Sequence, residues 1–182
     1  MKYDVIGGRP SNAFPGTLTR VDSPYEVVSY QPDPTNPPTR LGDPVVLDGT
    51  SGLPRKLLIS DFDGTTHALL APIFGFVVRQ YPVTNTTYPP TADTIPGSPA
   101  TGETLSIARG GYLNVFVTDY QGTPVTVGAP VRVANETSSN LLGSIQASAQ
   151  GGDATLVATF ASAPDVNGFA EIRITGNPLG TV

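Results

Sequence analysis

The amino-acid sequence predicts an all-β fold, a β-barrel or a jelly-roll-like sandwich with an extended, proline-rich N-terminal arm. Short runs of alternating apolar and polar residues recur at a spacing of roughly eight to twelve residues, with Gly-rich connections. The 19 prolines of this 182-residue chain leave no room for long helices, because proline breaks the helical hydrogen-bond pattern. Charged residues make up only 14%, against roughly 25% in soluble globular proteins, which suits a β protein with many neutral turns.

Residues 1–42 are predicted to form the extended arm. Seven of the prolines lie within the first 38 residues, and each one also biases its predecessor away from the helical region. The same segment carries aromatic and β-branched side chains, more apolar groups than a pure spacer needs. We therefore expect an arm that lies along another surface, with a loosely ordered tail as the alternative.

Residues 43–182 are predicted to form a single β-barrel or jelly-roll domain with a long loop at 82–102, rich in Pro and Thr. Within the run 68–81, Pro72 and Gly75 indicate a bulge or an edge strand. The last run alternates, with Ile172 and Ile174 separated by charged residues. A short helix is predicted near 138–146. The predicted strands are 44–49 (ending in an Asp-Gly turn), 55–60, 68–81, 103–109, 112–119, 124–135, 154–162 and 169–176.

The stretch LLISDFDGTT, residues 57–66, resembles the Asp-x-Asp-Gly-Thr signature of haloacid-dehalogenase-type phosphatases. That chemistry needs a lysine and a metal-binding carboxylate pair downstream of the first aspartate. Both lysines of this chain precede Asp61, no second carboxylate accompanies Asp153, and no alternating strand–helix pattern follows. We interpret Leu57–Ile59 as a buried strand and Asp63-Gly64 as a turn in which Gly64 takes a positive φ. The sequence predicts no catalytic residue and no enzyme.

Other candidate sites are equally weak. His67 is the sole histidine and cysteine is absent, so a catalytic triad or a zinc site lacks its usual ligands. The segment SDFDGT echoes part of a calcium loop, but the closing glutamate is missing. We predict no cofactor and no bound metal.

Charge and hydropathy restrict the partners. The net charge of −5 and the absence of any basic run make nucleic acid a poor partner. No apolar segment is long enough for a signal peptide or a membrane span. We therefore expect a protein that is made in the cytoplasm and binds neither nucleic acid nor a membrane.

The order of segments from about residue 68 onwards resembles the structural cement, or head decoration, proteins of tailed bacteriophages. No single motif carries this resemblance; the ordered series does, over roughly 110 residues. The Pro-rich leader, the DFDGT segment and the loop at 82–102 depart from the family's pattern. The similar segments are IFGFVVRQY (73–81), ETLSIARGGYLNVFV (103–117), VTVGAPVRVAN (125–135), ATFAS (158–162) and AEIRIT (170–175).

The resemblance implies a structural virion protein that sits on the outer surface of a capsid, bridges neighbouring major capsid subunits and stabilises the head. It also implies self-association, with a homotrimer preferred to a homodimer, and synthesis in the bacterial host. The alternative is a receptor- or carbohydrate-binding β module of a virion, although the chain has no tryptophan for a sugar platform. The expected partner-contact residues are Arg9, Phe14, Arg20, Tyr25, Tyr30, Arg40, Tyr81 and Tyr88.

Overall fold

The computed structural model describes residues 15–20, 26–78, 104–122, 124–135, 140–147 and 154–175. Within these ranges the chain is all-β, as predicted, and its one helical piece is a single 3-10 turn. The elements are β1 (Glu26–Tyr30), β2 (Pro44–Leu47), β3 (Pro54–Arg55), η1 (Ile59–Asp61), β4 (Gly75–Val78), β5 (Leu105–Phe116), β6 (Pro130–Val133), β7 (Ile145–Gln146), β8 (Ala154–Phe160) and β9 (Phe169–Ile174).

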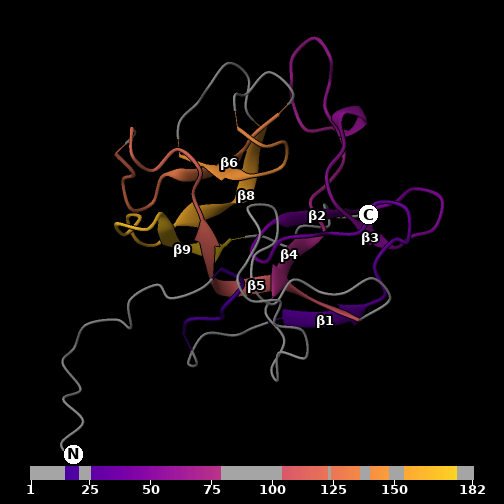
Figure 1. The fold of residues 1–182 in the computed structure, drawn as a ribbon, viewed down its shortest axis with the longest axis horizontal. Coiled ribbons are helices and arrows are strands. Elements are labelled where there is room, and N and C mark those ends of the chain that lie inside the picture. The colour runs from indigo at the N-terminus through magenta and orange to yellow at the C-terminus, as the bar shows by residue number, and fades with distance from the viewer. Residues whose placement is uncertain are drawn as a thin grey trace, which may run out of the picture.

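The strands form one antiparallel sheet with the order β3-β2-β4-β5-β9-β8-β6-β7, and β1 pairs with β5 outside this path. β5 is 12 residues long and joins the two halves of the sheet. Its first half pairs with β1 and β4, and its second half pairs with β9. In Figure 1, β6, β8 and β9 lie together on one side of the molecule, and β1 to β4 lie on the other.

The sheet curls until its β7 end meets the residues that follow β5. Val117 forms a parallel bridge with Ile145, and the Thr118 N–H donates to the Ile145 carbonyl at 2.9 Å. The Ala147 N–H donates to Asp119 Oδ1 at 2.7 Å and fixes the same junction. β5, β9, β8, β6 and β7 thus wrap around a core as in a barrel. The two separate sheets of a jelly roll are not confirmed, because both halves share β5.

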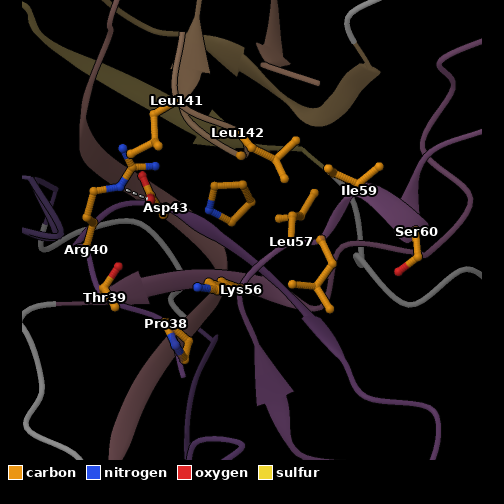
Figure 2. Close-up of a pocket in the computed structure, with 13 residues that line it drawn as sticks. Pro38, Thr39, Arg40, Asp43, Lys56, Leu57, Ile59, Ser60, Leu141 and Leu142 are labelled. Atoms are coloured by element: carbon orange, nitrogen blue, oxygen red, sulfur yellow. Dashed lines mark hydrogen bonds and ion pairs between the residues drawn. The ribbon is translucent and has the colours of Figure 1, made fainter. Parts of the chain in front are cut away.

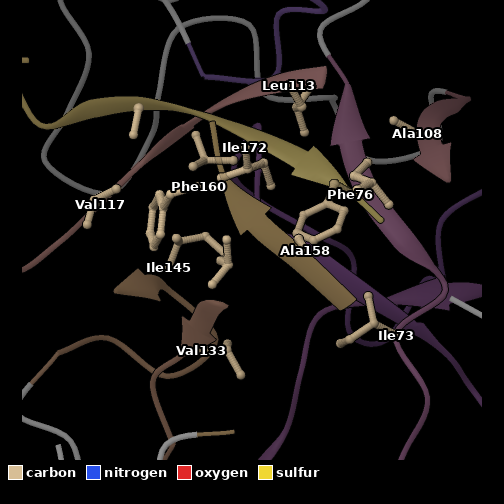
Figure 3. Packing of buried hydrophobic residues seen from close by; sticks show 14 of the residues in the cluster. Ile73, Phe76, Ala108, Leu113, Val117, Val133, Ile145, Ala158, Phe160 and Ile172 are labelled. Carbon is tan, nitrogen blue, oxygen red and sulfur yellow. The ribbon is translucent and has the colours of Figure 1, made fainter. Parts of the chain in front are cut away.

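The larger hydrophobic cluster fills the inside of this curl. Figure 3 shows Phe76, Phe160 and Ile172 pointing toward one another from β4, β8 and β9. All three side chains are at most 1% exposed. Burying an apolar side chain of this size stabilises the fold by about 1.5–3 kcal/mol, so this cluster is the main source of stability.

A second cluster lies on the opposite face of β2 and β4. Successive residues of a strand point to opposite faces, and in β4 Phe76 and Val78 enter the first cluster while Val77 enters the second. Val28 and Tyr30 of β1 pack against this second cluster. The sheet is therefore buried on both faces here. The second cluster consists of Leu41, Val45, Phe74, Val77, Leu105 and Ile107.

The described part of the predicted N-terminal arm is docked on its own domain. Residues 26–30 form β1, and Leu41 belongs to the second cluster. Further upstream, Leu18 forms an antiparallel bridge with Leu113 of β5. The Gly16 N–H donates to the Asn114 carbonyl at 2.7 Å. A functional division at residue 42 stays a prediction, and the predicted loop at 82–102 lies outside the described residues.

β5 corrects the prediction of two strands at 103–109 and 112–119. The strand runs unbroken through Gly110-Gly111, where its partner changes from β1 to β9. Gly111 has a φ of 101°, a conformation that glycine adopts without strain and other residues rarely reach. The glycine pair therefore bends one strand instead of separating two.

Gly75 corrects the prediction of a bulge or edge in the run 68–81. β4 is an interior strand, paired with β2 on one side and β5 on the other. A Cβ at Gly75 would lie 2.5 Å from Ile107 Cγ2 and 2.6 Å from the Ala108 carbonyl oxygen. Glycine is required because the β5 chain comes too close for a side chain.

Other boundaries also differ from the predictions. The strand predicted at 55–60 ends at Arg55. Ile59 is 63% exposed, so the prediction of a buried strand at Leu57–Ile59 is wrong. The strand predicted at 124–135 is confined to Pro130–Val133. Of the helix predicted near 138–146, residues 138–139 are not described. Residues 140–147 contain a turn and β7 instead. The strands at 44–49, 154–162 and 169–176 are confirmed as β2, β8 and β9.

Candidate functional site

The carboxylate of Asp61 is fully engaged by a neighbouring guanidinium. Arg55 donates from Nη1 to Asp61 Oδ2 at 2.6 Å and from Nη2 to Oδ1 at 2.7 Å. The Leu58 N–H donates to the same Oδ2 at 2.7 Å. Asp61 is only 5% exposed. A carboxylate must be accessible to attack a phosphoryl group, and Asp61 instead holds η1 against β3.

The second aspartate of the DFDGT segment shapes a turn. Asp63 Oδ1 accepts from the Thr65 N–H at 2.8 Å, and Oδ2 accepts from the Thr66 hydroxyl at 2.9 Å. These bonds hold the pKa of Asp63 below its usual value. The positive φ of this turn belongs to His67, at 57°, and not to Gly64 as predicted. The resemblance to the phosphatase signature is thus accounted for by an ion pair and a turn.

The described residues also contain no group of three or more His, Asp or Glu side chains that could hold a metal ion. In the same part of the chain, no helix is long and apolar enough to cross a membrane. The described residues do form a groove.

This groove, of about 530 Å³, lies between three chain segments, and we call it the Lys56 groove. Figure 2 shows Arg40 and Asp43 at one end, Ile59 and Ser60 at the other, and Leu57 and Leu142 between them. Its lining residues are Pro38, Thr39, Arg40, Asp43, Pro44, Lys56, Leu57, Leu58, Ile59, Ser60, Leu141, Leu142 and Gly143.

Backbone hydrogen bonds fix the three walls of the Lys56 groove. The Lys56 N–H donates to the Asn36 carbonyl at 3.1 Å and ties the first two segments together. The Gly143 N–H donates to the Ala134 carbonyl at 2.8 Å and anchors the third segment to the end of β6. A Cβ at Gly143 would lie 3.5 Å from Leu57 Cβ, so the third wall packs directly against the second.

Among the charged residues that line the groove, Arg40 and Asp43 form an ion pair and Lys56 does not. Arg40 Nε donates to Asp43 Oδ2 at 2.5 Å. Burial raises the pKa of Asp43 to about 7, while the charge of Arg40 and its hydrogen bond lower it in part. The 24% of the Asp43 side chain that stays exposed limits this desolvation. Lys56 is exposed and forms no ion pair with the described residues. The groove therefore presents a positive charge beside apolar side chains.

Comparison with known proteins assigns the family. A family model described as "Structural cement protein (E217 gp24/Pam3 gp6)" matches residues 3–175. The chain belongs to the structural cement proteins of bacteriophages. This membership makes it a structural protein of the phage capsid, found in the virion, and places it in no known enzyme class.

The fold of this cement protein also occurs in a solved capsid. A chain in the capsid of Myoviridae phage XM1 superimposes with a TM-score of 0.65 and 17% sequence identity. The match covers 97% of this chain and 98% of that chain. No curated protein matches the sequence. At this identity the likeness shows a shared fold.

Three of the eight residues expected to contact partners are described, and each has a partner within the chain. Arg20 binds Glu171 through both carboxylate oxygens, at 3.2 and 2.6 Å. Tyr30 packs edge-on against Phe74, with ring centroids 5.1 Å apart. Arg40 pairs with Asp43 and lines the Lys56 groove. Partner contact by these residues stays a prediction. Arg9, Phe14, Tyr25, Tyr81 and Tyr88 lie outside the described residues.

Sequence reasoning missed the groove of this cement protein. Lys56 and Ile59 lay in a predicted strand, and Leu141 lay in a predicted helix. The available signal was the Leu-Leu pair at 141–142, which stands in the polar stretch SSNLLGS. Two adjacent large apolar residues in a polar stretch are candidates for a contact surface.

Proposed function

We propose that this protein decorates the outer surface of a tailed-phage capsid, bridges neighbouring major capsid subunits and thereby stabilises the head. The family match over residues 3–175 is the observation that carries this proposal. The composition supports it, because a net charge of −5 disfavours nucleic acid as a partner. Synthesis in the cytoplasm of the bacterial host, with no membrane partner, completes the proposal.

A cement protein acts through the area that it covers. A stable contact between two proteins buries on the order of 800 Å² per partner, and contacts to two subunits reinforce each other once the first has formed. The Arg55–Asp61 ion pair supports a non-catalytic role, since it occupies the carboxylate that resembles a phosphatase nucleophile. The protein then strengthens the shell without turning over a substrate.

The proposal includes self-association and a contact made by the N-terminal region. We favour a homotrimer over a homodimer, because copies around a threefold axis contact several shell subunits together. Residues 15–18 dock on β5, and we assign the contact to the segment that precedes Pro15 in the sequence. This segment contains two of the expected contact residues, Arg9 and Phe14.

Binding to phage heads that lack the protein tests the proposal. Purified protein is added to such heads, its occupancy is measured by sedimentation, and the temperature of DNA release is recorded with and without it. We expect saturable binding and a higher release temperature. A truncated variant without residues 1–14 keeps the described docking contacts and should bind with reduced occupancy. Heads that bind no protein, or that release DNA at an unchanged temperature when saturated, would contradict the proposal.

A further inference from the structure

Lys56 lines the groove that bears its name and has no opposite charge paired with it among the described residues. The charged side chains around it are already engaged: Arg40 pairs with Asp43, and Arg55 pairs with Asp61. Lys56 is exposed and has no ion-pair partner among the described residues. The whole chain is acidic, with a net charge of −5. A local positive site on an acidic protein favours a partner that brings a carboxylate to this place.

Two large apolar side chains stand at the walls of the same groove. Ile59 and Leu141 are each 63% exposed, although they come from segments more than 80 residues apart. Single exposed apolar residues are ordinary on a protein surface, whereas apolar residues gathered around a hollow indicate a contact surface. Figure 2 shows Leu141 and Ile59 on the two sides of the hollow, with Leu142 and Leu57 between them. An occupant with an apolar side chain would remove both from water.

The walls are held in place before any partner arrives. The bidentate Arg55–Asp61 pair fixes η1, which carries Ile59. The Ser144 N–H donates to the Leu141 carbonyl at 2.9 Å and closes the turn that carries Leu141. A preformed groove loses little conformational freedom on binding, so more of the contact energy appears as affinity.

We propose that the Lys56 groove is the docking site for an extended segment of the capsid shell protein in which a carboxylate side chain lies beside a branched or aromatic apolar one. The carboxylate pairs with Lys56, and the apolar side chain packs between Ile59 and Leu141. This inference rests on the proposed function and names the surface that performs it. The charge complementarity selects an acidic, apolar segment.

Surface variants with a matched control test the groove. Ile59→Asp and Leu141→Asp place a carboxylate on exposed groove positions, and Val127→Asp does the same at a 64% exposed position that does not line the groove. All three sites are exposed, so the variants should keep the melting temperature of the wild type within a few degrees. Each substitution is made in the full-length protein, which is then added to phage heads that lack this protein. We expect each groove variant to bind these heads about tenfold or more weakly than the wild type. Val127→Asp should stay within about twofold.

Lys56→Gln tests the charge. Removing this cation should weaken binding by about threefold to tenfold at low salt and should make the remaining affinity less dependent on salt concentration. An unchanged salt dependence would contradict the pairing of Lys56 with a carboxylate.

A photo-reactive amino acid in place of Thr39, which is exposed on the groove rim, identifies the occupant. In saturated heads we expect adducts with the shell protein. Adducts with a second copy of this chain or within one chain, or no adduct, would overturn the inference. If wild-type protein binds heads and all groove variants bind like Val127→Asp, the groove is not the docking site, and the proposed function stands. If wild-type protein does not bind heads, the docking role of the groove and the proposed function are both wrong.

Discussion

Ion pairs hold the irregular segments of this protein against its sheet. Arg55 and Asp61 join η1 to β3, and Arg20 and Glu171 join the N-terminal segment to β9. Both carboxylates are nearly inaccessible, with side-chain exposures of 5% and 4%. A buried pair of this kind adds little over an apolar pair of the same shape, but the loss of one partner leaves an uncompensated buried charge.

Asp61→Asn should therefore destabilise the protein strongly. It removes the charge that Arg55 binds through two hydrogen bonds, and we expect the free energy of unfolding to fall by about 3 kcal/mol. Urea denaturation measures this change. The control is Asp63→Asn, two residues further on, because Asn keeps the Oδ1 acceptor of the exposed turn; we expect a change within about 0.5 kcal/mol. Equal effects of the two substitutions would show that the Arg55–Asp61 pair is not a structural link.

At the scale of elements, turns defined by single carboxylates connect the short strands. The turn between β2 and β3 is held by Asp48, whose Oδ1 accepts from the N–H groups of Ser51, at 2.8 Å, and Thr50, at 3.0 Å. These bonds, that of Ser51 above all, keep the pKa of Asp48 below its unfolded value of 3.8. The turn is thus built around an ionised side chain.

The stability of this turn should depend on pH at the acidic end. Because the folded pKa of Asp48 is lowered, its contribution is complete above the unfolded value of 3.8 and is lost as the pH falls through the folded value. Asp48→Asn should flatten the dependence of the free energy of unfolding on pH below 3.8 relative to the wild type. Denaturation curves at a series of acidic pH values check this; parallel curves for the two proteins would argue against an ionised Asp48 in the turn.

The N-terminal segment should open locally when its ion pair is removed. Arg20 binds Glu171 and lies 3.8 Å over the Tyr112 ring, while the Thr19 N–H donates to the Tyr112 carbonyl at 3.2 Å. In Arg20→Met we expect amide exchange of Gly16 and Thr19 to accelerate about tenfold, which corresponds to about 1.4 kcal/mol. Arg173→Met is the control, since Arg173 is exposed and lies 6.0 Å from the same ring. Equal acceleration of amide exchange in the two variants would show that Arg20 does not hold the N-terminal segment in place.

The sequence predicts strands well where the alternation of apolar and polar residues determines them. It predicts structure poorly where contacts between residues distant in sequence determine it. β8 and β9 form where alternating runs predict strands. Glu171 interrupts the β9 pattern, because it is 3% exposed and is paired with Arg20, 151 positions away. Gly75 and Gly110-Gly111 suggested an edge and a break, since the close approach of β5 and its change of partner depend on the assembled sheet. The Lys56 groove escaped prediction for the same reason: its walls are distant in sequence.

At the scale of the whole molecule, the chain is a curled sheet with two cores and a preformed groove on its surface. The first cluster closes the barrel-like half, and the second is covered by β1 and neighbouring N-terminal residues. The described residues between Glu26 and Gly42 thus stabilise the domain. In the proposed role, a domain with two packed cores holds two shell subunits at a fixed separation, which a flexible tether could not do.

A reconstruction of the intact phage particle would show where this protein sits on the shell. We expect density for this chain on the outer face of the shell, across the joint between neighbouring capsid subunits, with the Lys56 groove turned toward one of them. Density inside the shell, or density on a single subunit with no contact across a joint, would contradict this expectation.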